Sequence, residues 1–186
     1  KQLSLDKGQY FVMSTHREEN VDALDNLLKI TSIANKIAEK YELPIIVSTH
    51  PRTSVRLKQL NFDKNKNVHF MKPFGFLDYV HLQMHAKAVL SDSGTITEES
   101  SILNFPALNL REEHERPEGF EQASVMFVGL SLDRILQGIE ILNTQERAET
   151  RQLKIVEDYV PDNVSEKVLR IIQSYMDFIN RKVWHK

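Results

Sequence analysis

The chain has 186 residues, of which 41% are hydrophobic and 27% are charged, and its formal net charge is -2. This length and apolar content predict one domain around one hydrophobic core. Because charges of both signs are interspersed, the composition argues against a nucleic-acid-binding surface and against a polybasic membrane patch. The sequence has no Cys, which excludes disulfides and thiolate metal sites, and no apolar run approaches the ~18 residues of a membrane span. The amino-terminal residues show no signal-peptide pattern, and we expect a cytoplasmic protein.

Short apolar runs alternate with helical patterns along most of the chain. The clearest helical pattern covers 24–41, where apolar residues recur at helical spacing and Pro44 follows just beyond. Shorter helices are predicted at 53–60, 77–85, 96–103 and 132–142, and buried strands at 10–14, 44–48, 68–71, 88–90, 107–110 and 125–128. Strands separated by helices of this length form right-handed βαβ crossovers. The sequence therefore predicts an α/β fold with a doubly wound parallel sheet covered on both faces.

The last part of the chain is predicted to contain a connector and a long helix. Residues 143–159 are charged and weakly patterned, which indicates a surface helix or a connector. The closing helix carries one apolar stripe, formed by Val164, Val168, Ile171, Ile172, Tyr175, Ile179 and Val183. This stripe needs a packing surface, and the pattern alone does not distinguish the sheet of the same domain from a partner domain. The chain also begins without Met and enters a strand almost at once, so we expect that part of the protein precedes it.

Polar residues follow the predicted strands at their carboxyl ends. His16 and Arg17 follow the first strand, His50 the second, Ser93 the fourth and Arg111 the fifth. Ligands of open parallel sheets bind in the crevice at these ends. A lone His after a strand is more often a surface or capping residue than a catalyst, so these positions carry weight only as a group.

The segment SDSGTITEES links the fourth strand to the next helix. The turn Ser93-Gly94-Thr95 offers free backbone N–H groups at the positive end of the helix dipole, and Gly94 lets an oxyanion approach closely. This arrangement suits the diphosphate of a nucleotide. The alternative is a plain helix cap, in which a hydroxyl of the turn and one of the two following glutamates form a capping box.

Glu99 favours the ligand over the cap. Counting three and four residues along the helix places it beside Ile96, Ile102 and Leu103, on the inward stripe. An ionised carboxylate on an inward face needs hydrogen-bond donors. The hydroxyls of a ribose would supply them, and so would backbone donors of a neighbouring helix. Glu98, one residue earlier, is expected to point elsewhere.

A second candidate phosphate ligand lies in the charged stretch REEHERPEGFE, which begins at the carboxyl end of the fifth strand. Charge runs of this kind are usually solvated loops. Arg116, however, directly precedes Pro117, which restricts its backbone. Its guanidinium could therefore reach phosphates held by Ser93 and Gly94.

Three ordered motifs, THREEN at 15–20, SDSGTITEE at 91–99 and HERPE at 114–118, resemble the carboxyl-terminal half of the non-hydrolysing UDP-N-acetylglucosamine 2-epimerase family. The resemblance covers nearly the whole chain. It implies a Rossmann-like domain, the C-terminal nucleotide-binding domain of a GT-B architecture, with the active site in the cleft between two domains. The stretch KPFGFLDY and the closing helix are most similar to the branch that epimerises a UDP-linked 6-deoxy-L-talosamine derivative to UDP-N-acetyl-L-fucosamine for bacterial capsule or O-antigen.

The resemblance also implies roles for individual residues. His16 matches the catalytic histidine beside the sugar, and Arg17 and His50 lie where a regulatory nucleotide could reach. The residues implied for UDP binding are Ser93, Gly94, Thr95, Glu99, Arg116, Phe74 and Tyr79, of which Tyr79 and the backbone near Phe74 would hold uracil. Two positions depart from the family pattern, because Thr95 replaces a second Gly and Glu18 a second Arg of many members.

The implied substrate is a UDP-activated N-acetylated amino sugar, epimerised at C2 by elimination and re-addition of UDP. No metal or redox cofactor is implied, and no nucleic-acid or membrane partner is expected. The missing N-terminal domain would supply the proton-transfer carboxylates and the packing surface for the helix at 164–186, and the complete enzyme would be a homodimer. A UDP-sugar glycosyltransferase domain and a non-catalytic flavodoxin-like binding module remain alternatives.

Overall fold

The computed structural model describes residues 3–60, 62–113 and 115–186. The chain forms two compact units, one ending at Val156 and one spanning Glu157–Lys186. Each unit is described by itself below.

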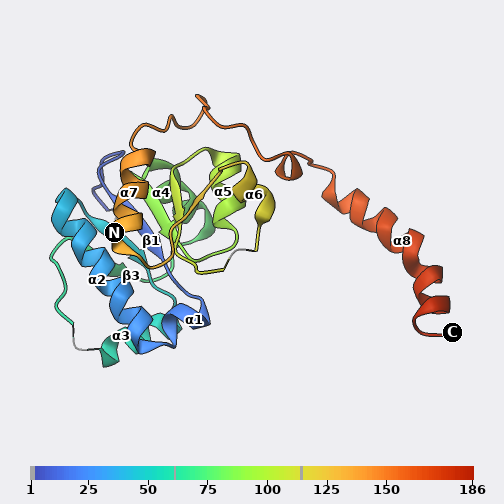
Figure 1. Ribbon diagram of the computed structural model, residues 1–186, viewed down its shortest axis with the longest axis horizontal. Coiled ribbons are helices and arrows are strands. Elements are labelled where there is room, and N and C mark those ends of the chain that lie inside the picture. Colours follow the sequence, from blue (N-terminus) through green and yellow to red (C-terminus); the bar gives the residue numbers. More distant parts are fainter. Residues whose placement is uncertain (1–2, 61, 114) are drawn as a thin grey trace. The chain divides into compact units, whose positions relative to one another are not determined.

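The first unit is built on one six-stranded parallel sheet with the strand order β3-β2-β1-β4-β5-β6 (Figure 1). Its strands are β1 (Phe11–Ser14), β2 (Ile45–Ser48), β3 (Val68–Met71), β4 (Ala88–Ser91), β5 (Ala107–Asn109) and β6 (Met126–Phe127). Ser14, the last residue of β1, is paired in register with Ser48 on one side and Ser91 on the other. The order reverses between β1 and β4, so the topological switch point lies at these serines. The predicted α/β fold, with a Rossmann-like doubly wound sheet, is confirmed.

Helices cover both faces of the sheet (Figure 1). Phe11 and Met13 pack in one cluster with the apolar sides of α2 (Leu24–Tyr41) and α7 (Leu132–Leu142). Val12, which points to the other side of the strand, packs in a second cluster with α4 (Phe76–His85), α5 (Ile96–Leu103) and α6 (Pro117–Glu121). Each fully buried Leu, Ile or Phe side chain contributes about 1.5–3 kcal/mol. The two clusters therefore fix which helices lie above the carboxyl ends of the strands.

Two short helices are absent from the sequence prediction. They are α1 (Glu18–Val21) and α6, and each is only about one turn long. A single turn is too short to show an apolar period, which explains why the pattern did not reveal them. The remaining helix, α3 (Pro51–Gln59), begins two residues before its predicted start because Pro51 occupies its first turn, where no N–H is required.

The connector after α7 is hydrogen-bonded to the ends of two helices. Arg147 donates to the carbonyls of Ala86 and Lys87, just after α4, and Arg151 donates to the last carbonyls of α5. The amide of Asn104, which ends α5 in a left-handed conformation, donates to two carbonyls of the connector. The region predicted as a surface helix or a connector is thus a connector, with one 3-10 turn at Glu157–Tyr159.

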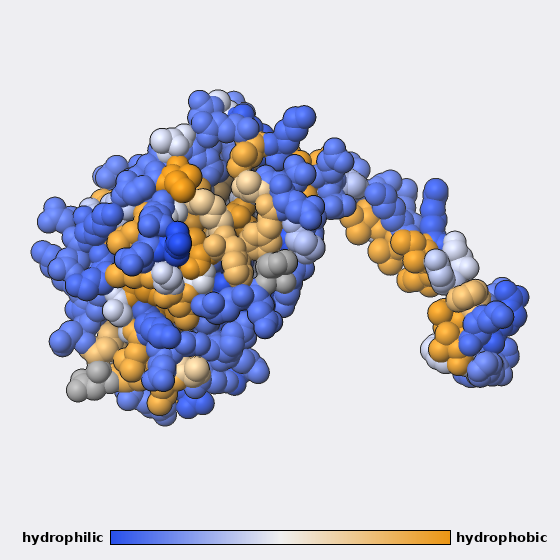
Figure 2. Space-filling view, viewed as in Figure 1, coloured by the Kyte–Doolittle hydropathy of each residue, from blue (hydrophilic) through white to orange (hydrophobic). Residues whose placement is uncertain are grey.

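The second unit consists of that turn and α8 (Val164–Lys182). Large apolar residues of the helix are exposed, among them Val168, Ile172, Tyr175 and Met176. Figure 2 shows the apolar side chains of α8 gathered along one side of the helix. The predicted apolar stripe is therefore present.

Gly138 lets α7 approach strand β5 closely. A Cβ built on Gly138 would lie 2.8 Å from a methyl carbon of the fully buried Leu108. Ala gains ~1 kcal/mol of helix propensity over Gly, but overpacking a core typically costs ~1–3 kcal/mol. We therefore expect Gly138→Ala to lower the free energy of unfolding by about 1 kcal/mol in urea denaturation. The exposed neighbour Gln137→Ala should change it by less than ~0.5 kcal/mol, and a stabilised Gly138→Ala would mean that Leu108 can move aside.

Candidate functional site

A buried carboxylate, Asp92, joins the ends of the two central strands. It is 0% exposed and accepts hydrogen bonds from the backbone N–H groups of His16 and Arg17, each at 3.1 Å, and from the Asn20 amide at 3.0 Å. The imidazole Nδ1 of His16 lies 3.3 Å from an oxygen of Asp92, while the His16 side chain is 44% exposed. Asp92 therefore holds the loop after β1 and orients a solvent-facing imidazole above the switch point.

The turn Ser93-Gly94-Thr95 leads from β4 directly into α5. Thr95 is the N-cap residue, but no side chain caps the helix in the part of the chain that the structure describes. The hydroxyls of Ser93 and Thr95 instead share a hydrogen bond of 2.9 Å with each other. The capping box considered as the alternative is therefore not formed. The positive end of the α5 dipole faces the carboxyl edge of the sheet beside Gly94. This edge is called the rim below.

Arg116 lies next to this turn. A Cβ built on Gly94 would lie 3.7 Å from Cζ of Arg116, and the Arg116 Nε donates to Glu98 at 2.5 Å. The expected proximity of Arg116 to Gly94 is thus present. Glu98 does point away from Glu99, as expected, and its carboxylate holds this guanidinium. The sequence could not reveal the pair, since its members lie on α5 and on the loop before α6.

Two further arginines lie on the same rim and share one carboxylate. Glu115 accepts two hydrogen bonds from Arg17, at 2.7 and 3.2 Å, and one from Arg111 at 3.1 Å. The hydrogen bonds from Arg111 and then Arg17 lower the pKa of Glu115 from 4.5 to about 2. A Cβ on Gly94 would lie 3.4 Å from a carboxylate oxygen of Glu115. The arginines are therefore gathered beside the phosphate-type turn and are held there by glutamates.

Glu99 faces α4. Its Oε2 accepts a hydrogen bond of 2.8 Å from Nε2 of Gln83, and Tyr79 lies one turn before Gln83 on the same helix. Burial raises the pKa of Tyr79 to about 12 despite a hydrogen bond with the Ser14 side chain, and the charges of Glu99 and Asp92 raise it further. Tyr79 and Glu99 are thus neighbours near the end of β1.

The predicted inward stripe of α5 is only partly correct. Ile96 is fully buried, as expected, but Ile102 is 45% exposed. Glu99 is half-buried against α4 and not on the side of α5 that packs on the sheet. The reason is geometric, because α5 packs on a sheet and a neighbouring helix at once, and helical spacing alone does not separate the two directions.

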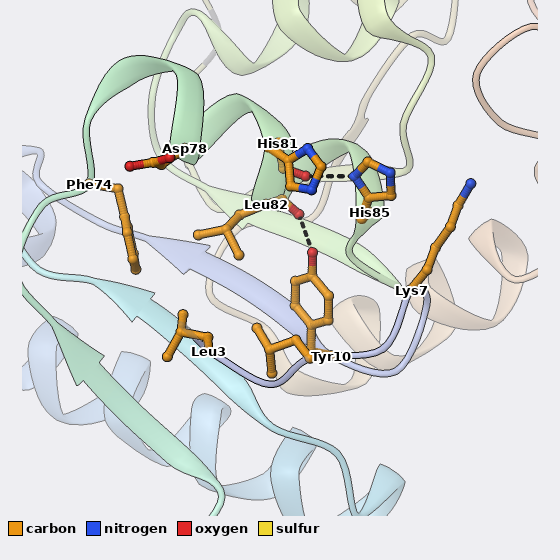
Figure 3. A pocket seen from close by; sticks show the side chains of 9 residues that line it. Leu3, Lys7, Tyr10, Phe74, Asp78, His81, Leu82 and His85 are labelled. Carbon is orange, nitrogen blue, oxygen red and sulfur yellow. Dashed lines mark hydrogen bonds between the residues drawn. The ribbon is translucent and has the colours of Figure 1, made fainter. Parts of the chain in front are cut away.

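Phe74 lies apart from Tyr79. Its ring lines a cavity of about 630 Å³ with Leu3, Tyr10 and Leu82, and Tyr79 is not among the lining residues (Figure 3). The Tyr10 hydroxyl donates to the Leu82 carbonyl at 2.8 Å and closes one wall of the cavity. The Phe74 ring therefore faces this cavity, and the expectation that the backbone near Phe74 holds uracil stays a prediction.

His50 is the N-cap of α3. Its Nδ1 accepts a 3.3 Å hydrogen bond from the backbone N–H of Arg52. Arg52 also pairs with Glu18, at 2.9 Å, and with Asp22. Glu18, the departure from the family pattern, thus has an arginine partner in the first turn of α3. His50 and Arg17 both lie at the carboxyl edge of the sheet, after β2 and β1.

Three residues of this region escaped the sequence analysis, namely Gln83, Asp92 and Glu115. Asp92 lies at the carboxyl end of a predicted strand, which places it at the same edge as His16, but its burial did not follow from the sequence. Gln83 carried no signal, since Glu99 is 16 residues away, and for Glu115 the sequence shows only the nearby Arg111 and not Arg17, which is 98 residues away. Within the described ranges no group of His, Asp and Glu is arranged to hold a metal ion, and no helix is long and apolar enough to cross a membrane.

Comparison with known proteins identifies the family. The family model described as UDP-N-acetylglucosamine 2-epimerase matches residues 1–173. The chain belongs to this family. The UDP-N-acetylglucosamine 2-epimerase of Methanocaldococcus jannaschii is 39% identical over 142 residues, which make up 74% of this chain and 39% of that protein. The predicted family resemblance is confirmed.

Solved structures of the family superpose on the chain. The UDP-N-acetylglucosamine 2-epimerase from Rickettsia bellii is 43% identical, with a TM-score of 0.82 over 98% of this chain and 49% of that one. The Methanocaldococcus jannaschii enzyme in complex with UDP-GlcNAc and UDP is 33% identical, with a TM-score of 0.78 over 89% of this chain and 45% of that one. The chain spans less than half the length of each relative named here.

The arginine-bound carboxylate of Glu115 should give stability a measurable acid dependence. Because the folded-state pKa is depressed to about 2 from 4.5, its contribution is present above pH 4.5 and is lost as the pH falls toward 2. Glu115→Gln should therefore destabilise the chain near neutral pH, and the difference from wild type in unfolding free energy should shrink as urea titrations move to acid. Added salt should also reduce this difference in unfolding free energy, since the Glu115 carboxylate is exposed and its charge is screened. A difference independent of pH would contradict the role of the arginines.

Proposed function

We propose that this chain supplies the UDP-binding half of a UDP-N-acetylhexosamine 2-epimerase. The observation that carries the proposal is the juxtaposition, at the switch point of the sheet, of the Ser93-Gly94 turn, Arg116 and Glu99. Nucleotides bind at such a point in doubly wound folds. Membership of the UDP-N-acetylglucosamine 2-epimerase family supports UDP as the nucleotide.

The diphosphate would bind at the start of α5. Gly94 has no side chain to obstruct an oxyanion, and the uncapped first turn offers backbone N–H groups at the positive end of the helix. Arg116 lies beside the same turn and can form charge-assisted hydrogen bonds with phosphate. Ser93 and Thr95 add hydroxyl donors on the exposed side. These groups match the charge that develops on UDP when it departs as a leaving group.

The nucleoside would bind between α4 and α5. Glu99 is one turn inside α5, and its carboxylate is a hydrogen-bond acceptor for the two hydroxyls of a ribose. Tyr79 lies next to Glu99 and offers a flat, partly buried ring for the uracil base. The backbone near Phe74, just before α4, would provide hydrogen bonds to the uracil edge. A ribose between base and diphosphate fits this order of groups.

The reaction would proceed by elimination and re-addition. A base removes the C2 proton, the C1–O bond breaks with its electron pair on UDP, and a glycal forms; a proton then returns to the other face of C2 and UDP adds back at C1. His16 would act at the sugar as acid, base or charge stabiliser, held by Asp92. The carboxylates for proton transfer at C2 would come from the N-terminal half.

The helix α8 would pack on that N-terminal half. Its apolar side chains, which are exposed within the second unit, need a packing surface and support this placement. The complete enzyme would be a homodimer in the cytoplasm. Arg17 and His50, at the carboxyl edge of the sheet, would be accessible to a regulatory or substrate-side nucleotide.

The finer substrate assignment rests on sequence. The stretch KPFGFLDY and the segment that forms α8 favour the conversion of UDP-2-acetamido-2,6-dideoxy-L-talose to UDP-N-acetyl-L-fucosamine. The product would serve bacterial capsule or O-antigen synthesis. The missing half would make most contacts to the hexose, so this chain alone should bind UDP and UDP-N-acetylglucosamine with similar affinity.

Glutamate-to-glutamine variants test the nucleotide site. If Glu99 binds the ribose, Glu99→Gln should weaken uridine and UDP about tenfold or more in calorimetry, because charge-assisted hydrogen bonds contribute roughly 1.5–3 kcal/mol. Uracil, which has no ribose, should be unaffected. Glu98→Gln should alter UDP but not uridine, because Glu98 contacts Arg116, and the exposed Glu39→Gln is the matched control. Equal losses for uracil and uridine, or no binding of UDP by wild type, would contradict the proposal.

A second experiment addresses His16 in an active enzyme that contains this chain. His16→Ala should lower turnover by about 10²–10⁴-fold, as expected for loss of a general acid or base, and change UDP affinity much less. His69→Ala, on the exposed side of the edge strand β3, is the control and should leave both unchanged. Equal losses in turnover and in affinity would make His16 a binding residue.

A further inference from the structure

The helix α4 places a buried amide against Glu99. Gln83 is only 1% exposed, and its Nε2 donates to Oε2 of Glu99 at 2.8 Å. Its Oε1 is buried and has no hydrogen-bond partner within the ranges that the structure describes. A buried carbonyl without a partner costs free energy that an apolar side chain of similar size would avoid. The amide is therefore retained in the apolar layer for what its N–H does to Glu99.

The orientation of α4 determines how the two helices meet. The helix runs back from the carboxyl ends of the strands, so Gln83 lies one turn deeper than Tyr79, whose hydroxyl contacts the end of β1. Gln83 thus supports Glu99 from below, on the side away from the rim. The bond engages Oε2 and leaves Oε1 of Glu99 for a ligand.

We infer that Gln83 is a positioning residue that aims Glu99 at the vicinal diol of a ribose. The helices α4 and α5 would then recognise the ribose together. The inference rests on the proposed UDP site for its ligand. A carboxylate on a flexible Glu side chain has several rotamers, and a fixed donor to one oxygen selects one of them. Gln83 acts only through Glu99, and ribose recognition should therefore depend on its N–H and not on its size.

Two variants of this chain separate the N–H from the volume. Gln83→Met keeps the length of the side chain but removes the donor. We expect it to weaken uridine about tenfold, the scale of one charge-assisted hydrogen bond. Affinity for 2′-deoxyuridine should fall less and affinity for uracil should stay within about twofold of wild type. Gln59→Met, at an exposed position of α3, is the matched control and should behave as wild type.

Gln83→Glu adds a readout that a purely structural role would not produce. Two carboxyl groups at this distance share a proton, so at low pH the protonated residue 83 donates to the ionised Glu99 and replaces the amide. Uridine affinity of Gln83→Glu should therefore approach wild type at acid pH and fall as the pH rises and both groups ionise. The titratable group of α4 that also interacts with Glu99 is Tyr79, which in turn feels the charge of Asp92 from the end of β4, and both residues are present in every variant.

The outcomes are distinct for the two proposals. Wild type that binds neither uridine nor UDP would overturn the UDP site and, with it, the ligand of Gln83. Wild type that binds uridine while Gln83→Met binds it equally well would overturn the role of Gln83 alone. Thermal unfolding shows whether each variant folds. If Gln83→Met does not fold, the pH dependence of Gln83→Glu decides, and an affinity unchanged by pH would overturn the inference.

Discussion

The buried carboxylate of Asp92 is the interaction on which the rest of the rim depends. At the switch point the helices after β1 and β4 depart to opposite faces of the sheet, and the register between β1 and β4 ends at Ser14 and Ser91, with one more backbone hydrogen bond from the Asp92 N–H to the Ser14 carbonyl. A buried carboxylate is tolerated only when donors surround it, and Asp92 receives them from the loop after β1. This requirement fixes the loop that carries His16 relative to the turn that carries Gly94. The distance between His16, which we propose to act at the sugar, and the Gly94 turn, which we propose to bind phosphate, is thereby constrained by one side chain.

The charged rim follows from the same constraint. With the loop after β1 fixed, Arg17 reaches Glu115, and Glu115 also engages the buried Arg111. Glu98 likewise accepts a hydrogen bond from the guanidinium of Arg116. Guanidinium groups that gather without anions would repel one another, and the paired glutamates reduce this repulsion while keeping the arginines near Gly94. The positive charges are therefore positioned before any ligand arrives, which lowers the ordering cost of binding.

The sheet was predictable from sequence because buried parallel strands are short apolar runs and the helices between them carry an apolar period. The carboxyl-end positions of His16 and Ser93 followed from that topology. The pairs did not follow. Gln83 and Glu99 are 16 residues apart, Glu98 and Arg116 are 18 apart, and Arg17 and Glu115 are 98 apart. Each pair forms because one helix or loop packs on another in a particular way. The periodicity of the sequence does not predict this tertiary packing.

The adjacent Glu98 and Glu99 illustrate what that packing decides. In sequence they are equivalent acidic residues in the first turns of a helix, where either carboxylate would interact favourably with the positive end of the helix dipole. Successive residues of an α-helix are rotated by about 100°, so one faces α6 and Arg116 while the other faces α4 and Gln83. Diphosphate and ribose are consecutive parts of the proposed nucleotide ligand, and the proposed site assigns one direction to each part. A helix that began one residue earlier or later would turn both carboxylates away from their partners. The start of α5 at Thr95 is thus a constraint on the site as well as on the fold.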